Sequence, residues 1–282
     1  MSGRTLNSAI LLLIVGNAFA IGSDVIVKLV STDVPIFQFV FMRSLCSVIL
    51  LVPFWQQMDR ETPLSGLKIH AFRAHVSLTG VVCLVFALGN LPLATVTALF
   101  YTSPLMVVLI AILLFGERLN WRSVLAVISG ALGIIVILRP VEVDWAAFSA
   151  LGVAACLAIM RVIVRKLPKH QTTIHALMLN YLLVLPASLL MALIEAAPVD
   201  WSLLISAMGS SLFILGYNMT VLLAYRNAHA SHVTSAEYTG LIWSVLIGWV
   251  WFGEAPSLWF LAGATMIITP LILLLLKPRR SQ

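Results

Sequence analysis

The sequence predicts an all-α integral membrane protein with ten transmembrane helices, arranged as two inverted five-helix repeats. Its composition is the first observation, since 61% of the 282 residues are hydrophobic and only 10% are charged. Soluble domains contain about 45–50% apolar and about 25% charged residues. The second observation is a series of apolar segments of about 20 residues, the length that crosses a bilayer as a helix. The third is an internal duplication of one such segment.

Ten apolar spans follow one another, separated by short turns that mostly contain proline. We expect them at 6–29, 34–55, 72–90, 94–115, 121–138, 146–164, 174–194, 201–224, 230–252 and 257–276. Prolines inside three of the spans predict kinks; they are Pro104, Pro186 and Pro270. Small residues on the fifth and eighth spans predict close helix contacts. They include Gly130, Gly133, Gly209 and Gly216.

The duplication relates the fourth span to the ninth. Residues 96–117, VTALFYTSPLMVVLIAILLFGE, align without a gap with residues 233–254, VTSAEYTGLIWSVLIGWVWFGE. We therefore divide the chain into a first repeat, 1–139, and a second, 140–282. Because each repeat has an odd number of spans, the second must enter the bilayer from the opposite face. Inverted repeats place a substrate site near the midplane and open it alternately to either side.

The basic residues collect on one side of this predicted topology. Of the 17 lysines and arginines, 14 fall in segments on the side of both chain ends. They are Arg4, Arg60, Lys68, Arg73, Arg118, Arg122, Arg161, Arg165, Lys166, Lys169, Arg226, Lys277, Arg279 and Arg280. The positive-inside rule then places both ends in the cytoplasm. It also explains the net charge of +6 without a nucleic-acid partner.

Several other classes of site are not expected. Cys46, Cys83 and Cys156 lie in apolar segments, which favours buried thiols over disulfides. The sequence Ala18-Phe19-Ala20 imitates a signal-peptidase site, but the apolar run continues beyond it and the duplication needs this span. There is no Walker loop, dinucleotide fingerprint or metal-ligand spacing. We therefore expect no cofactor, no metal and no ATPase subunit.

Glu237 is the only acidic residue placed well inside a predicted span. An ionised carboxylate in a membrane is costly unless it is paired, protonated or hydrated, so it is a site candidate by default. It would bind a substrate ammonium, carry a proton, or do both in turn. The alternative is a structural acid that ties helices together through hydrogen bonds.

Polar residues in the first two spans are further candidates. Arg43, near the centre of the second span, would hold a substrate carboxylate, pair with Glu237 or dock on helix carbonyls, and a structural role is favoured. Asn17 suits a cavity wall or an interhelical hydrogen bond equally well. Asp24 and Lys28 are spaced i, i+4, which most simply predicts a local salt bridge.

Three tyrosines complete the candidate substrate-binding set. Tyr101 and Tyr238 occupy equivalent positions in the duplicated segment, and Tyr181 follows Asn180 in the middle of the seventh span. They would supply aromatic walls and hydroxyl donors to an amphipathic solute. Aromatic residues at helical spacing serve packing more often than binding, and that alternative stays open.

The chain resembles the drug/metabolite transporter superfamily in its ten-helix EamA-domain branch. The resemblance rests on Phe115-Gly116-Glu117-Arg118, its copy Phe252-Gly253-Glu254, Pro104 and Arg43. It implies small-solute transport rather than catalysis, and the sequence is most similar to bacterial exporters of amino acids and related metabolites in the inner membrane. The second copy departs from the pattern, with Leu241 in place of Pro104 and Ala255 in place of Arg118.

The predicted function is therefore alternating-access export of a small amphipathic metabolite, preferably an amino acid, across the bilayer. Proton coupling stays open. A rival is a proton-driven multidrug pump, in which organic cations compete for Glu237. A membrane enzyme acting on lipid would need a cluster of catalytic groups at one interface, and a scaffold would have no use for the duplicated polar-aromatic segment.

Overall fold

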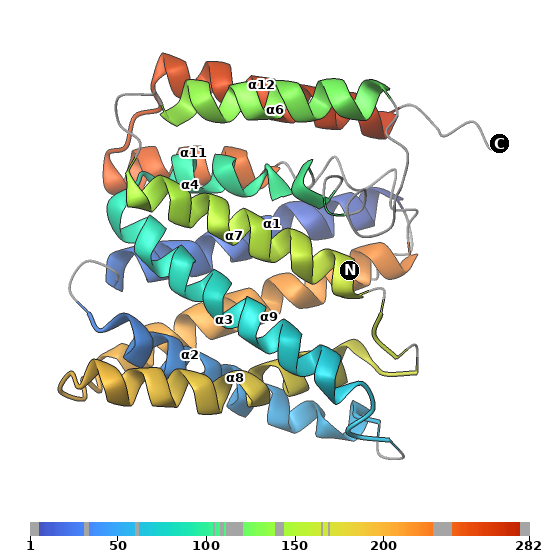
Figure 1. Ribbon diagram of the computed structural model, residues 1–282, viewed down its shortest axis with the longest axis vertical. Coiled ribbons are helices and arrows are strands. Elements are labelled where there is room, and N and C mark those ends of the chain that lie inside the picture. The colour runs from blue at the N-terminus through green and yellow to red at the C-terminus, as the bar shows by residue number, and fades with distance from the viewer. Residues whose placement is uncertain are drawn as a thin grey trace.

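The computed structural model describes residues 6–30, 34–59, 62–103, 105–107, 110, 121–138, 144–164, 166–168, 170–227 and 239–276. Ten α-helices, one 3₁₀-helix and no strand occur in these residues. The helices are α1 (Leu6–Val30), α2 (Ile36–Leu51), η1 (Val52–Gln57), α3 (Leu67–Asn90), α4 (Leu93–Phe100), α6 (Trp121–Leu138), α7 (Trp145–Val164), α8 (Thr173–Glu195), α9 (Leu203–Asn227), α11 (Thr239–Phe252) and α12 (Leu258–Leu276). They run back and forth across the bundle (Figure 1).

The all-helical membrane fold is confirmed. Six helices are long and apolar enough to span a membrane, and four further apolar helices are shorter within the described residues. The third helix begins at Leu67, five residues before the predicted start at 72. Its first turns contain Lys68, His70 and Arg73, and these polar side chains lowered the hydropathy by which the span was recognised.

The fourth span, in which the sequence predicted a kink at Pro104, is interrupted by a turn. Helix α4 ends at Phe100, and a turn follows at Tyr101 and Thr102. Helical bonding resumes when the amides of Leu105 and Met106 donate to the Thr102 carbonyl, at 2.9 and 3.1 Å. The sequence places Pro104 just after this turn, and a proline lacks an amide hydrogen and clashes with the carbonyl four residues earlier, here that of Phe100, where α4 ends. Pro104 itself and residues 111–120 lie outside the described residues.

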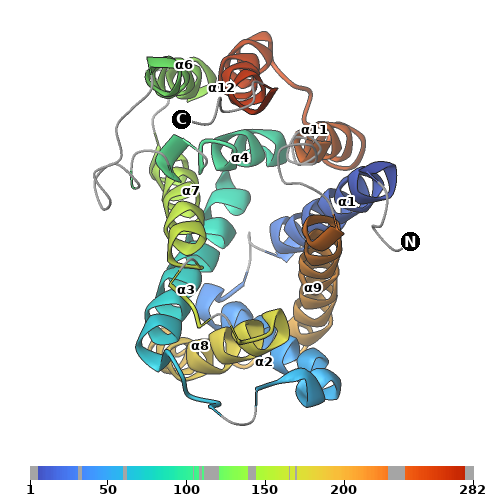
Figure 2. The same ribbon diagram turned by 90° about the vertical axis from the view of Figure 1, so that its right-hand side faces the viewer.

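The contacts between helices repeat in a two-fold pattern (Figure 2). If α1–α6 correspond in order to α7–α12, the pair α1 and α9 is equivalent to the pair α7 and α3. Both pairs are in contact, as are α2 with α8 and α6 with α12, two pairs that the symmetry maps onto themselves. Helices α1 and α7 also run in opposite directions across the bundle (Figure 1). This is the arrangement expected of two inverted repeats.

The main core lies where the two repeats meet. Its largest cluster of buried apolar side chains draws on α1–α4 of the first half and α7–α9 of the second, with Phe39, Leu88 and Leu93 fully buried. Helices α6 and α12 form a separate layer beyond α4 and α11 (Figure 2). Their crossing depends on glycine, because a Cβ atom at Gly133 would lie 2.7 Å from the carbonyl oxygen of Gly263. The predicted small-residue contact of the fifth span is thus confirmed.

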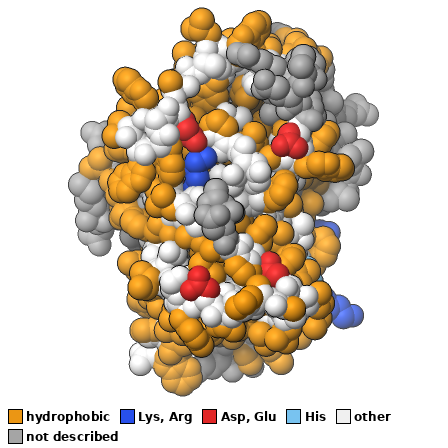
Figure 3. Space-filling view, turned by 90° about the vertical axis from the view of Figure 1, so that its left-hand side faces the viewer, with side chains coloured by type: hydrophobic (Ala, Val, Ile, Leu, Met, Phe, Trp, Pro, Cys, Tyr) orange, Lys and Arg blue, Asp and Glu red, His pale blue; other side chains and the backbone are white. Residues whose placement is uncertain are grey.

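Two glutamates cap helix N-termini at one end of the bundle. The Glu195 carboxylate, at the end of α8, accepts from the amides of Phe37 and Gln38 in the first turn of α2, at 3.4 and 3.1 Å. The Glu254 carboxylate, between α11 and α12, accepts from the amide of Leu93 at the start of α4, at 2.8 Å. Carboxylates are favourable at helix N-termini because they satisfy free amides and face the positive end of the dipole. Figure 3 views the face on this side, where a few charged groups interrupt a largely hydrophobic and uncharged surface.

Candidate functional site

A first polar group joins α1 to the broken part of α4 and the start of α11. The Asn17 amide on α1 donates to the Thr239 hydroxyl at 3.0 Å, and Asn17 is 5% exposed. A Cβ atom at Gly240 would fall against the Tyr101 hydroxyl and lie 3.6 Å from Asn17. Nearby on α11, the indole of Trp243 donates to the Ile14 carbonyl at 3.1 Å. An interrupted helix beside a buried amide is a common setting for substrate sites in transporters.

A second polar group surrounds Arg43 on α2, which is 7% exposed. One guanidinium nitrogen donates to the Ser23 hydroxyl of α1 at 3.3 Å. Asp24 of α1 and Tyr181 of α8 both interact with the guanidinium electrostatically. Asp24 is buried, and its carboxylate does not come within the 4.0 Å of Arg43 that defines an ion pair. The acid and the base are therefore neighbours that do not touch.

Serine hydroxyls fix the helices around Arg43. Ser23 and Ser210 share a hydrogen bond of 2.8 Å between α1 and α9. Ser47 and Ser211 both donate to the backbone carbonyl of Arg43, at 3.0 and 2.8 Å. These bonds satisfy buried polar groups and do not use the guanidinium of Arg43. They hold Arg43 in position and leave its guanidinium able to bind other partners.

The two groups share one face of α1. Asn17 and Asp24 are seven residues apart, two helical turns, which places them on the same side of the helix at a separation of about 10 Å along its axis. Of the predicted site residues, the structure thus gathers Asn17, Arg43, Tyr101 and Tyr181 around α1, α2, α4 and α8. Glu237 and Tyr238 lie outside the described residues, directly before Thr239.

The predicted salt bridge between Asp24 and Lys28 is wrong. Lys28 instead pairs with Glu254 at 2.8 Å and donates to the Leu91 carbonyl at 2.7 Å. Its ammonium also lies 5.4 Å from the centre of the Phe252 ring. The i, i+4 spacing identified a possible local partner. In the structure, however, the end of α1 meets two segments that are distant in sequence, and these supply the acceptors Glu254 and the Leu91 carbonyl. Asp24 interacts electrostatically with Arg43 instead.

Asp24 and the serines were not recognised as site residues from the sequence. A signal was present, because Ser23-Asp24 and Ser210-Ser211 each place two adjacent polar residues inside an apolar span.

The described part of the chain contains no group of three or more His, Cys, Asp or Glu side chains able to hold a metal ion. The arrangement offers a buried cation, a buried acid, amide and hydroxyl groups, and is suited to binding rather than bond cleavage.

The bundle is all-helical, with two inverted repeats, an interrupted helix and buried charges where the repeats meet. This combination is typical of membrane transporters. The model of the EamA-like transporter family matches residues 7–139 and again residues 144–276. The chain belongs to this family.

Named relatives transport different solutes. A riboflavin transporter of Brucella anthropi is 29% identical, over 84% of this chain and 87% of that protein. The pseudopaline exporter CntI of Pseudomonas aeruginosa is 24% identical, over 95% and 96%. An S-adenosylmethionine uptake transporter of Rickettsia bellii is 24% identical, over 92% and 90%. A crystal structure with 18% identity superposes with a TM-score of 0.55 over 94% of this chain and 95% of that one, which shows a shared fold.

Proposed function

We propose that the protein is a secondary transporter that exports small amphipathic metabolites, preferably amino acids, from the bacterial cytoplasm by alternating access. Both chain ends would lie in the cytoplasm, and residues 1–139 and 140–282 would form the two repeats. Asn17, Arg43, Tyr101 and Tyr181, with Glu237 and Tyr238 beside them, would form the substrate site.

The observation that carries this proposal is the separated pair of opposite charges at Arg43 and Asp24. A zwitterion carries a carboxylate and an ammonium a few ångströms apart, and it would bridge a buried guanidinium and a buried acid that do not touch each other. Buried charges need such partners, because the free-energy penalty of desolvation is several kcal/mol per ion. Tyr101 and Tyr181 would supply the amphipathic surface for the side chain of the solute.

The names of the relatives support a transporter of small solutes and leave its cargo to experiment. Riboflavin, S-adenosylmethionine and pseudopaline differ in size and charge, and the names include both uptake and export. The choice of an amino acid therefore depends on the pair Arg43 and Asp24. A lone organic cation would satisfy Asp24 but would be repelled by Arg43.

The test is transport in proteoliposomes of the purified protein, with and without a pH gradient. The panel would contain labelled leucine, leucinamide, riboflavin, S-adenosylmethionine and tetraphenylphosphonium. We expect leucine to move and leucinamide, which lacks the carboxylate, to move poorly. Arg43→Gln and Asp24→Asn should each abolish leucine transport, whereas Lys68→Gln, at an exposed lysine, should not. Movement of tetraphenylphosphonium but no amino acid would replace this proposal with cation efflux.

The contribution of Glu237 is tested in the same vesicles. Dependence on the pH gradient that disappears in Glu237→Gln would identify Glu237 as the coupling group. Transport down a leucine gradient that is unaffected by Glu237→Gln would leave Glu237 as a structural residue of a facilitative exporter.

A further inference from the structure

A second buried polar cluster lies at the end of the bundle where α3 and α8 begin, away from the pair Arg43 and Asp24. His70 and His175 are fully buried, and their ring centroids are 6.3 Å apart. Arg73, one turn beyond His70 on α3, is 7% exposed and interacts electrostatically with His70. Asn180 of α8 is 5% exposed and donates to the Ser77 hydroxyl at 3.4 Å.

This cluster contains most of the unsatisfied buried polar atoms in the described residues. The guanidinium Nε and one terminal nitrogen of Arg73 have no hydrogen-bond partner, and neither ring nitrogen of His175 has one. The same is true of His70 Nδ1 and Asn180 Oδ1. Buried polar groups are usually paired, and a buried guanidinium without an acceptor is among the most costly exceptions. No ion pair with Arg73 occurs among the described residues.

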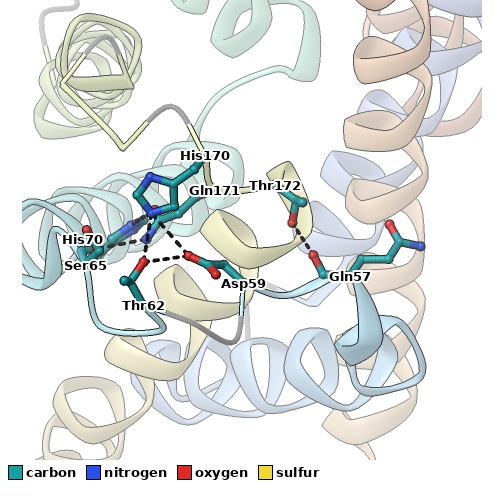
Figure 4. Close-up of polar contacts among 8 residues, drawn as sticks. All are labelled: Gln57, Asp59, Thr62, Ser65, His70, His170, Gln171 and Thr172. Carbon is teal, nitrogen blue, oxygen red and sulfur yellow. Dashed lines mark hydrogen bonds and ion pairs between the residues drawn. The ribbon is translucent and has the colours of Figure 1, made fainter.

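The protonation of His70 can be worked out from its neighbours. The Gln171 amide nitrogen donates to the Ser65 carbonyl at 2.9 Å, which turns the Gln171 amide oxygen toward His70. That oxygen only accepts, so His70 Nε2 is the donor in their 2.8 Å bond. Figure 4 shows this arrangement, with Gln171 between the two helix starts.

An open pocket lies beside Gln171, the residue that is bonded to His70. The pocket has a volume of about 370 Å³ and is lined by Gln57, Met58, Asp59, Thr62, His170 and Thr172. Its lining therefore includes both chain neighbours of Gln171, and one of them, His170, pairs with Asp59 at 3.2 Å. A solute in the pocket would reach the cluster by displacing one glutamine side chain.

We propose that Arg73, His70 and His175 form a binding site for the carboxylate of the transported metabolite, entered from this pocket. A guanidinium binds a carboxylate through two parallel hydrogen bonds, and imidazole N–H groups add further donors. Both α3 and α8 begin here, and helix N-termini favour anions. The identity of the solute rests on the proposed function; the anion site itself does not.

The first experiment measures anion binding without transport. Thermal unfolding of the detergent-solubilised protein would be recorded in sodium acetate, sodium phosphate and sodium chloride at equal ionic strength. We expect acetate and phosphate to raise the Tm above its value in chloride. Arg73→Gln should abolish this difference, and Arg161→Gln, at an exposed arginine on α7, should retain it. If the wild-type protein unfolds at the same temperature in all three salts, the proposal is overturned.

Two further arms separate the remaining outcomes. If Arg73→Gln does not fold, His175→Asn replaces it, with the same expectation. Stabilisation by added phosphatidylglycerol but not by soluble anions would mean that the cluster binds a lipid headgroup, and it would overturn the proposal of a substrate site.

In proteoliposomes, Arg73→Gln should raise the KM for leucine by about 10- to 100-fold, the change expected from the loss of one or two charge-assisted hydrogen bonds. Absence of any leucine transport would contradict the proposed function and leave the anion result intact.

Discussion

Serine hydroxyls in the middle of the bundle set the register of four helices at single positions. Ser23 and Ser210 join α1 to α9, while Ser47 and Ser211 converge on the Arg43 carbonyl. Hydrogen bonds between membrane helices average about 0.6 kcal/mol and reach about 1.7 kcal/mol. The free energy of each bond is small. However, apolar side chains pack against lipid equally well in different helix registers, so these few hydrogen bonds determine the position of the Arg43 guanidinium.

Replacement of Ser210 by alanine should therefore weaken the fold by a small amount. The change removes the 2.8 Å bond to Ser23, and we expect a loss of about 0.5–1.5 kcal/mol in unfolding free energy. Ser206→Ala, one turn earlier on the same helix, is the matched control and should have less effect. Denaturant unfolding in mixed micelles measures both, and equal losses would show that the bond contributes nothing.

The contact between Gly240 and Tyr101 permits a sharper test of the first polar group. Gly240→Ala places a methyl group against the Tyr101 hydroxyl, so we expect this variant to transport substrate more slowly than wild type. Tyr101→Phe removes the hydroxyl, and the double variant should therefore regain part of the activity lost by Gly240→Ala. Initial rates in proteoliposomes decide the matter. Additive losses in the double variant would show that the two residues act independently.

Sequence reasoning identified isolated polar residues more reliably than it identified their partners. Asn17, Arg43 and Tyr181 stood out because each interrupts an apolar span; in the structure Asn17 and Arg43 are buried and Tyr181 is partly buried. The partner of Lys28 was missed because Glu254 is 226 positions away, beyond any local spacing rule. Arg73 was assigned to the cytoplasmic basic residues and His70 was not considered, since hydropathy does not show that a helix continues through polar residues when its partner helix buries them.

Helices as elements were predicted well, and the exact form of the interruption in the fourth span was not. Where the structure describes the helix ends, apolar length and proline-rich turns located them to within a few residues, except where α3 begins and where α4 ends. Pro104 predicted a kink in the fourth span, but hydropathy is the same for a continuous helix and for two shorter pieces, so the break after Phe100 was not predicted. Only the hydrogen bonds at Thr102 distinguish the two, and these depend on the three-dimensional environment of the turn.

The layer of α6 and α12 depends on the close approach of two glycines. An alanine at position 133 would place its Cβ 2.7 Å from the Gly263 carbonyl, closer than a carbon atom tolerates. Gly133→Ala should therefore destabilise the protein by about 1–3 kcal/mol, as expected for overpacking. At Gly152 a Cβ would meet only the Cys83 sulfur, at an ordinary 3.5 Å. Gly152→Ala is thus the control, and a similar Tm loss in both variants would contradict the glycine-dependent crossing.

At the scale of the whole molecule, different contacts join the helices at the two ends of the bundle. At one end, Lys28 and Glu254 tie α1 to the start of α4 and the junction of α11 and α12. At the other, Gln171 bridges Ser65 and His70. Alternating access requires that only one end open at a time. In the proposed orientation, with both chain ends in the cytoplasm, the Lys28 end would face outward, and the Lys28–Glu254 ion pair would have to separate for solute release.

Cross-linking this end should therefore stop transport. In a background with Cys46, Cys83 and Cys156 replaced by alanine, Lys28→Cys and Glu254→Cys would be joined by a reducible bifunctional thiol reagent. We expect solute flux to fall to that of empty liposomes and to return when the linker is reduced, because α1 can then move away from the α11–α12 junction. Lys28→Cys alone, treated with the same reagent, controls for the modification. Undiminished flux in fully cross-linked protein would mean that the solute leaves by a route that this end does not gate.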